Sequence, residues 1–318
     1  MSLMALVGVV GAGRVGAALA AAFRAAGHDI VAAAGESDAS RNRIATMLPG
    51  VPRAKPTDVA RAADLLLLTV PDDMLENVVN TLVGAGAIRE GQYVVHTSGR
   101  HGLTVLDAAT AIGAHPVAMH PAMTFTGTTV DLDRLDGTVF GVTTNDTDKA
   151  YAEQLIADLG GLPLWVAESK RTLYHAGLAH GANHLVTLVA QAMELLAASG
   201  ADDPAATLRP LLSAALDNAL TYGDAALTGP IVRGDVNTVR AHLTDIAETA
   251  PGTIPAYVAM AKATADRAVL DGRLLPIRAA SIIGLLDDAL TRLSADPAQP
   301  HAENAPTRRN FTHGTGLQ

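Results

Sequence analysis

The chain of 318 residues contains no cysteine. Disulfide bonds, thiolate metal ligands and cysteine nucleophiles are therefore excluded, and the absence agrees with a reducing compartment. Aromatic residues make up only 3% of the chain, and 23 Lys and Arg stand against 32 Asp and Glu, for a net charge of −9. The sequence is acidic and contains no basic stripe with interleaved aromatic side chains, so we expect no nucleic-acid partner.

Long hydrophobic runs are also missing. The Ala- and Leu-rich stretches are interrupted by Glu, Gln or Asn before they reach the roughly 20 residues that span a membrane. The first ten residues lack the basic segment and cleavage site of a signal peptide. We therefore expect a soluble, cytoplasmic protein with no membrane partner. The 11 histidines are dispersed, and the i, i+4 pair His180 and His184 has no evident third ligand, so we predict no metal site.

A glycine-rich segment, Gly11-Ala12-Gly13-Arg14-Val15-Gly16, lies between an apolar run at residues 5–10 and an Ala-rich helical segment. In a strand-to-helix turn of this kind, the first glycine allows the tight turn and the second lets the backbone approach a pyrophosphate. The third lets helix and strand pack closely. Backbone amides and the helix dipole add a phosphate site. The sequence therefore predicts dinucleotide binding at Gly11, Gly13, Arg14, Val15 and Gly16.

The first half of the chain alternates short apolar runs with amphipathic segments, as parallel strands joined by crossover helices do. We expect strands at residues 5–10, 30–34, 65–70, 93–96, 116–119 and 138–143. After Leu164-Trp165-Val166 the apolar positions follow helical spacing instead. We expect helices near residues 170–199, 204–222, 236–249, 253–270 and 276–293.

These patterns predict an α/β fold, with an N-terminal doubly wound Rossmann-type sheet followed by an all-helical C-terminal domain. The dinucleotide-binding domain is expected over residues 1–167, and the helical substrate and dimerisation domain over 168–294. Residues 295–318 have little apolar content and are expected to form a flexible tail.

The choice of nicotinamide cofactor depends on the loop after the second expected strand. Glu36 alone favours NAD, because an acidic residue there accepts hydrogen bonds from the ribose. Ser37, Ser40, Arg41 and Arg43 favour NADP, because together they offer charge-assisted hydrogen bonds to a 2′-phosphate. In the alternative interpretation, Ser40 caps the next helix and the arginines are solvated. We favour NADP, with Ser37, Ser40 and Arg41 as ligands, and NAD stays open.

Three expected strands deliver polar groups to the carboxyl edge of the sheet, where ligands of such folds bind. The backbone of Val70 and Pro71 is predicted to line the cofactor ribose. Ser98 is predicted to hydrogen-bond a substrate carboxylate or carbonyl group, whereas His96 fits a satisfied histidine inside its strand. His120 follows the next strand and is a further catalytic candidate.

The chain resembles a known family in the glycine motif and in four further segments: Thr69-Val70-Pro71-Asp72, His96-Thr97-Ser98-Gly99, Met119-His120-Pro121, and the stretch from Thr228 to Asp235. This is the Rossmann-like family with a helical C-terminal domain of formerly unknown function, related to ketopantoate reductase, β-hydroxyacid dehydrogenase and pyrroline-5-carboxylate reductase. The resemblance covers roughly residues 5–293. It implies an NAD(P)-dependent oxidoreductase, dimeric through its helical domain, but not a particular substrate.

The resemblance also indicates where the proton donor lies. In ketopantoate reductases a lysine is followed four and eight residues later by asparagines, and aligning Asn183 with the second asparagine places His175 at the lysine. Eight helical residues rise about 12 Å, so both side chains can border one cleft. Histidine titrates near neutrality and suits a general acid. Lys170, Tyr174 and His180 remain competitors.

The segment from Thr228 to Asp235 is a Gly- and Pro-rich loop between helices. Arg233 is predicted to bind a substrate carboxylate, and Asp235 fits a cap of the next helix. We expect hydride transfer to a small carbonyl substrate, with a ketopantoate-like 2-oxo acid leading and an imine of the pyrroline-carboxylate type second. A regulatory protein that binds the cofactor without turnover is the remaining alternative.

Overall fold

The computed structural model describes residues 4–295. The described chain forms two compact units, and the boundary between them falls between Asn183 and His184. Residues 168–183, which the sequence analysis assigns to the helical domain, therefore group with the N-terminal unit. The expected flexible tail lies outside the described residues, except for Ala295, the last residue of helix α14.

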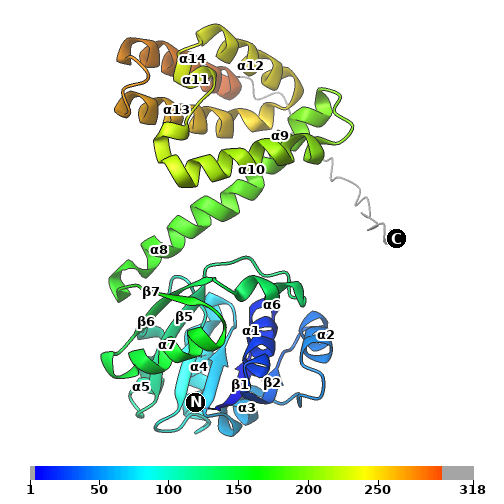
Figure 1. Cartoon of the computed structure of the whole chain (residues 1–318), viewed down its shortest axis with the longest axis vertical. Helices are drawn as coiled ribbons and strands as arrows, with labels where there is room; N and C mark the ends of the chain where they lie inside the picture. The colour runs from blue at the N-terminus through cyan, green and yellow to red at the C-terminus, as the bar shows by residue number, and fades with distance from the viewer. Residues whose placement is uncertain (1–3, 296–318) are drawn as a thin grey trace. The chain divides into compact units, whose positions relative to one another are not determined.

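Among residues 4–183, seven strands form one sheet in the order β2-β1-β3-β4-β5-β6-β7. The strands are β1 (Leu6–Val10), β2 (Asp29–Ala34), β3 (Leu65–Leu68), β4 (Tyr93–His96), β5 (His115–Pro121), β6 (Val139–Thr144) and β7 (Leu162–Trp165) (Figure 1). Neighbouring strands are parallel except β5 and β6, which are antiparallel. The predicted Rossmann-type sheet is confirmed, and β7 is an edge strand that the sequence analysis missed.

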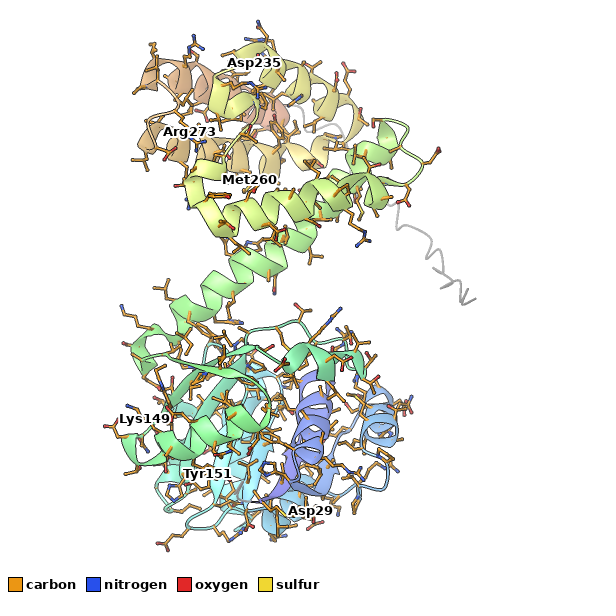
Figure 2. The ribbon with its side chains drawn as sticks, in the orientation of Figure 1. Asp29, Lys149, Tyr151, Asp235, Met260 and Arg273 are labelled. Atoms are coloured by element: carbon orange, nitrogen blue, oxygen red, sulfur yellow. The ribbon has the colours of Figure 1, made fainter. Side chains whose placement is uncertain are left out.

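Helices cover both faces of this sheet. They are α1 (Arg14–Ala25), α2 (Asp38–Met47), α3 (Pro56–Ala62), α4 (Asp72–Gly84), α5 (Asp107–Thr110), α6 (Val130–Leu135) and α7 (Lys149–Asp158). One core packs α1, α2, α6 and α7 against the sheet, and a second core packs α3, α4 and α5. At the start of α7, Tyr151 stacks on Tyr93 with ring centroids 3.8 Å apart (Figure 2). Because both faces are covered, the strands in the middle of the sheet are continuous apolar runs.

The segment after β7 begins with a 3₁₀ turn (Glu168–Lys170) and continues as helix α8 (Arg171–Leu178). The expected single helix over residues 170–199 is then interrupted by a π-helical turn at Ala179–Asn183, and α9 (His184–Ala198) follows. A π turn is wider than an α-helical turn and changes the angular phase of the residues that follow it. The assumption of a regular α-helix from His175 to Asn183 is therefore wrong.

All the regular elements among the described residues of the C-terminal unit are helices, as predicted. After α9 it contains α10 (Pro204–Tyr222), α11 (Pro230–Arg233), α12 (Val236–Thr249), α13 (Ile254–Leu270) and α14 (Pro276–Ala295). Its core is built mainly from α12, α13 and α14. Asp235 caps α12, because its Oδ1 accepts a hydrogen bond from Thr238 N at 3.2 Å and its Oδ2 accepts one from Thr238 Oγ1 at 2.7 Å.

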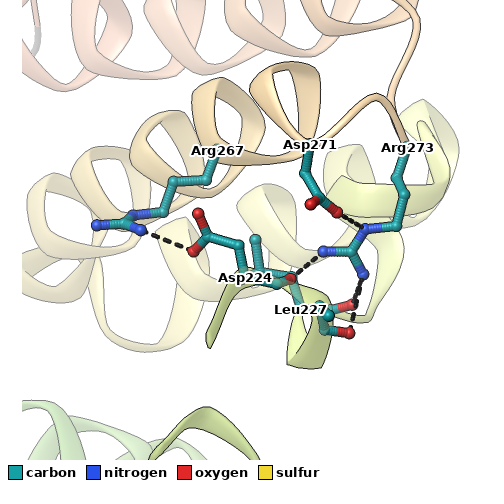
Figure 3. A network of polar contacts seen from close by, with 6 residues as sticks. Asp224, Leu227, Arg267, Asp271 and Arg273 are labelled. Carbon is teal, nitrogen blue, oxygen red and sulfur yellow. Dashed lines mark hydrogen bonds and ion pairs between the residues drawn. The ribbon is translucent and has the colours of Figure 1, made fainter. Parts of the chain in front are cut away.

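Two arginines hold the turn after α10 against the end of α13 (Figure 3). Arg267 donates to Asp224 Oδ1 at 2.7 Å. Arg273 donates to the backbone oxygen of Leu227 at 2.7 Å and also to that of Asp224, while Asp271 accepts from its Nε. These bonds satisfy carbonyl groups in the irregular stretch that leads into α11.

Helices α9 and α10 are unusual in how little of their apolar surface is buried. None of the α9 side chains is buried, and Leu208 is the only buried residue of α10. Exposed apolar residues include Leu185, Val186, Leu211 and Leu220. Even so, none of the described helices combines the length and apolar character needed to cross a membrane.

Candidate active site

Each glycine of the motif after β1 has a different surrounding. Gly11 has φ +94°, and a Cβ there would lie 2.8 Å from the backbone of Thr69 and Val70. A Cβ at Gly16 would clash with Thr69 Oγ1 and lie 2.7 Å from Gly11 O. At Gly13, by contrast, the nearest atom is Gly11 O at 3.7 Å, an ordinary contact. The fold therefore requires glycine at positions 11 and 16, whereas the space beside Gly13 is open to a ligand.

The first turn of α1 has the features of an anion-binding site. The amides of Gly11 and Ala12 both donate to Ala34 O, at 3.0 and 2.9 Å, so the loop is held by the end of β2. Among residues 4–295, no side chain caps α1, and its first turn contains no acidic residue. The leading amides of an uncapped helix carry partial positive charge, so this turn fits the pyrophosphate of a dinucleotide.

The loop after β2 differs from its predicted role in part. Ser37, rather than Ser40, caps α2, and its Oγ accepts from Ser40 N at 3.1 Å and lies 2.9 Å from Ser40 Oγ. Arg41 donates to the carboxylate of Asp38 and to the backbone oxygen of Glu36. These three predicted cofactor ligands are therefore engaged with their own loop.

Two other arginines lie together beside the glycine motif. Gly127, in the loop before α6, has φ +78°, and a Cβ there would lie 2.7 Å from Arg43 Nε and 2.9 Å from Arg14 Cγ. Neither guanidinium has an ion pair within residues 4–295. Arg14 opens α1 and Arg43 belongs to α2, so two unpaired positive charges border the loop where a dinucleotide phosphate fits.

A cluster of aromatic and polar side chains forms at the carboxyl edge of β4 and β5. A Cβ at Gly99, after β4, would clash with the ring of His175 and lie 3.1 Å from His120 Nε2. His120, near the end of β5, shares a hydrogen bond of 3.0 Å between its Nδ1 and the hydroxyl of Tyr174. The rings of His120 and His175 meet edge to face, with centroids 5.8 Å apart. The structure therefore brings together three segments that are distant in sequence.

The protonation states of this cluster are set mainly by burial. Burial, followed by the charges of His175 and Arg171, lowers the pKa of His120 to about 4. Burial raises the pKa of Tyr174 above 10, although the charge of Arg171 and a backbone hydrogen bond at Gly141 oppose the rise. At neutral pH the His120–Tyr174 pair is therefore uncharged, and each partner can both donate and accept a hydrogen bond.

His96 and Ser98 shape the loop beneath this cluster. The fully buried His96 accepts at Nδ1 from Ser98 N at 3.2 Å, so its Nε2–H donates to Gly102 O at 2.8 Å. Burial lowers the pKa of His96 to about 4, so it is a neutral, satisfied histidine. Ser98 Oγ accepts from His101 N at 3.1 Å, and only 7% of the residue is exposed.

The other sequence candidates belong to other elements of the fold. Val70 and Pro71 follow β3 next to Gly11, as expected for residues that line a ribose. Asn183 is an exposed residue at the end of the π turn. Arg233 is the exposed last residue of α11 in the C-terminal unit, and Lys170 is exposed just before α8.

Two residues around the start of α8, Glu168 and Arg171, were not predicted from the sequence. Arg171 is completely buried, and Glu168 receives hydrogen bonds from the amides of Leu103 and Thr104. A charged residue at a helix start is ordinarily solvated, so no local signal separated these two from surface residues. No group of three or more potential metal ligands occurs within the described residues.

The order of the strands and the helices on both faces of the sheet define a Rossmann-type fold. Residues 3–121 match the family model of a Rossmann-like domain, and residues 138–264 match that of a domain of unknown function, DUF2520. The expected family resemblance is confirmed, because the chain combines a Rossmann-like domain with a DUF2520 domain. No curated protein matches the chain.

Solved structures with the same fold come from several organisms. A protein of Bacteroides fragilis, provisionally named an NADP oxidoreductase, is 21% identical with a TM-score of 0.72, over 83% of this chain and 98% of that one. A reductive aminase of Aspergillus terreus in complex with NADPH is 17% identical with a TM-score of 0.56, over 91% and 95%. Pyrroline carboxylate reductase of Plasmodium falciparum with NADP bound is 12% identical with a TM-score of 0.53, over 93% and 98%. Identities this low show the fold alone.

Proposed function

We propose that the protein is an NADPH-dependent reductase of a small molecule that contains a C=N or C=O bond. The observation that carries this proposal is the uncharged His120–Tyr174 pair beside His175, at the same sheet edge as the glycine motif. Structural neighbours named as an NADP oxidoreductase, a reductive aminase and a pyrroline carboxylate reductase support it.

The glycine motif and its surroundings fit the cofactor. When bound, NADPH supplies a hydride to the carbon of the double bond, and the protein supplies binding, orientation and a proton. The amides at Arg14, Val15 and Gly16 would hold the pyrophosphate, and the open space beside Gly13 would admit it. The backbone of Val70 and Pro71 would line a ribose.

Our preference for NADP over NAD rests on the arginines near the glycine motif. Arg14 and Arg43 carry unpaired charges, whereas Arg41 is held by Asp38, so we assign the 2′-phosphate chiefly to the first two. Losing one charge-assisted bond costs about 1.5–3 kcal/mol, so Arg43→Ser should weaken NADPH binding by about tenfold or more and leave NADH binding unchanged. Arg41→Ser is the matched control and should change NADPH affinity less. Equal losses for NADPH and NADH in Arg43→Ser would contradict the assignment.

His175 is our leading candidate for the proton donor. It lies on α8 against His120 and Gly99, and its proton would go to the nitrogen or oxygen of the substrate as hydride reaches the carbon. General acids contribute about 10²- to 10⁴-fold, so His175→Ala should lower kcat by a factor in this range with little change in NADPH affinity. Asn183→Ala should have a much smaller effect on kcat. A His175→Ala variant with nearly full turnover would move the acid role to His120, Tyr174 or Lys170.

An imine becomes the leading substrate class, and a ketopantoate-like 2-oxo acid becomes the second. A panel of cyclic imines, carbonyl–amine mixtures and 2-oxo acids, followed by NADPH oxidation at 340 nm, tests both. Fluorescence titration should first show that NADPH binds. Binding without turnover across the panel would favour the regulatory alternative and contradict the reductase proposal. If the substrate carries a carboxylate that Arg233 binds, Arg233→Lys should raise KM with a modest change in kcat.

We also propose that the protein is a homodimer. The apolar side chains of α9 and α10 are left exposed in the single chain, with Leu220 79% exposed, and exposed patches of this kind mark protein interfaces. Sedimentation equilibrium should give twice the chain mass of 32.6 kDa. Leu220→Asp should shift the protein towards monomer, while Asp217→Asn on the same helix should not. A wild-type protein that stays monomeric at micromolar concentration would refute this.

A further inference from the structure

Arg171 is buried in a way that ordinary surface arginines are not. None of the residue is exposed, and no carboxylate lies within ion-pair distance of it among residues 4–295. Its NH2 donates to Ser98 O at 2.6 Å, and its NH1 donates to Gly141 O at 3.3 Å and to Thr143 Oγ1 at 3.1 Å. Its Nε has no hydrogen-bond partner in the described structure. A buried charge without a counter-ion is costly, so its retention calls for an explanation.

The acceptors of Arg171 belong to the elements that carry the candidate site. Ser98 precedes Gly99 in the loop after β4, and Gly141 pairs with His120 across the antiparallel strands. The guanidinium therefore joins the start of α8 to the loop after β4 and to strand β6. Tyr174 and His175 follow Arg171 by three and four residues, so all three lie on one face of α8. A helix of eight residues has little stability of its own, and its position depends on such anchors.

We propose that Arg171 is the positioning residue of this site: it fixes Tyr174 and His175 against His120 and keeps a positive charge beside that histidine. The charged and titratable groups that act on His120 are His175, Arg171 and Tyr174 from α8 and Asp72 from α4. Asp72 lies 3.5 Å from Arg100. Glu168, the carboxylate nearest in sequence to Arg171, is occupied by hydrogen bonds from Leu103 and Thr104. The charge of Arg171 is therefore poorly neutralised and favours uncharged His120.

The test combines two substitutions with one control in the full-length protein. Arg171→Met removes the charge and the hydrogen bonds, Arg171→Lys keeps the charge without the forked geometry, and Arg134→Met removes an exposed, unpaired arginine. NMR titration of the His120 ring, assigned with His120→Asn, reports the charge effect without any turnover. In Arg171→Met the His120 midpoint should rise by roughly half a unit to one unit, and Arg171→Lys and Arg134→Met should stay close to wild type.

The kinetic measurement rests on the proposed reductase function. Both Arg171 variants should lose about tenfold or more in kcat while the NADPH dissociation constant changes less than about threefold. Arg134→Met should keep full activity. In folded Arg171→Met, an unchanged His120 titration or an unchanged kcat would each overturn the inference.

The test remains decisive if Arg171→Met does not fold or if the wild type shows no turnover. If Arg171→Met does not fold, Arg171→Lys and Thr143→Val decide, since Thr143→Val keeps Arg171 and removes one of its acceptors together with the hydrogen bond from Thr143 Oγ1 to Val166 O. A lower kcat with unchanged NADPH affinity in both supports the inference, and an unchanged kcat in both overturns it. If the wild type turns over no substrate, the proposed function fails, while the titration still decides the role of Arg171.

Discussion

Alanine substitutions at Gly13 and Gly16 should separate ligand binding from folding within one loop. At Gly13, which has extended backbone angles, a new Cβ would meet only Gly11 O at 3.7 Å. Replacing glycine by alanine at a compatible site stabilises by about 0.4–1 kcal/mol through the unfolded chain, and this is offset by the poorer helix cap. The free energy of unfolding of Gly13→Ala should therefore stay within about 1 kcal/mol of wild type.

An alanine at Gly16 would instead be placed against two atoms that are hydrogen-bonded to each other. Its Cβ would clash with Thr69 Oγ1, which donates to Gly11 O at 2.6 Å, and would lie 2.7 Å from that oxygen. Overpacking of this kind costs about 1–3 kcal/mol. Gly16→Ala should therefore be destabilised by this amount, and Thr69→Ala in the same chain should restore part of the loss.

Gly13→Ala should weaken cofactor binding, although it should leave the free energy of unfolding almost unchanged. Its methyl group would occupy the space beside the first turn of α1, so the NADPH dissociation constant should rise by about tenfold or more, equivalent to about 1.4 kcal/mol. Urea unfolding and NADPH fluorescence titration of the two variants measure both quantities. Wild-type affinity in Gly13→Ala, or a loss of stability equal to that of Gly16→Ala, would refute the reasoning.

Three further predictions follow from contacts in the two units. Because the pKa values of His96 and His120 are lowered to about 4, protonation favours the unfolded chain. The contribution of the neutral histidines to the free energy of unfolding is fully present above pH 6.5 and is lost as the pH falls through 4. At pH 5 each histidine should cost about 2 kcal/mol, and equal urea midpoints at pH 7.5 and 5 would contradict this. A Cβ at Gly141 would clash with the Tyr174 ring. Gly141→Ala should therefore lower the free energy of unfolding by about 1–3 kcal/mol in the wild-type protein but by much less in Tyr174→Ala. Additive losses in the double-mutant cycle would argue against the contact. Asp235→Ala removes the cap of α12 and should cost about 1 kcal/mol, whereas Asp235→Asn should retain most of it; equal melting temperatures for all three proteins would show that the cap contributes nothing.

The elements that the sequence predicted well are those whose burial leaves a local pattern. Leu65–Leu68 is a continuous apolar run because both faces of β3 are covered. Strand β7 was missed because Leu162–Trp165 is exposed along its whole length and contains a proline, which ordinarily argues against a strand. The antiparallel direction of β6 also has no local signature, because strand direction depends on the path of the preceding connection.

The candidate site was predictable only in outline. The sequence placed Ser98, His120 and His175 among its candidates and His96 inside its strand as a satisfied histidine, but it could not show which of the candidates come into contact, because that depends on the packing of α8 against the sheet. Arg171 shows the same limit more sharply. Its acceptors, Ser98 O and Gly141 O, are backbone atoms that any residue would supply, so no sequence pattern records the contact.

One signal in the sequence does point to the cluster, and it lies in two glycines rather than in the reactive side chains. Gly141 stands inside strand β6 and has no turn to make, yet a Cβ there would clash with the ring of Tyr174. Gly99 likewise leaves its side-chain space to the ring of His175. A glycine within a strand often marks the close approach of another group. Both glycines lie next to His120. They therefore mark the place on the sheet edge where the aromatic side chains of α8 pack.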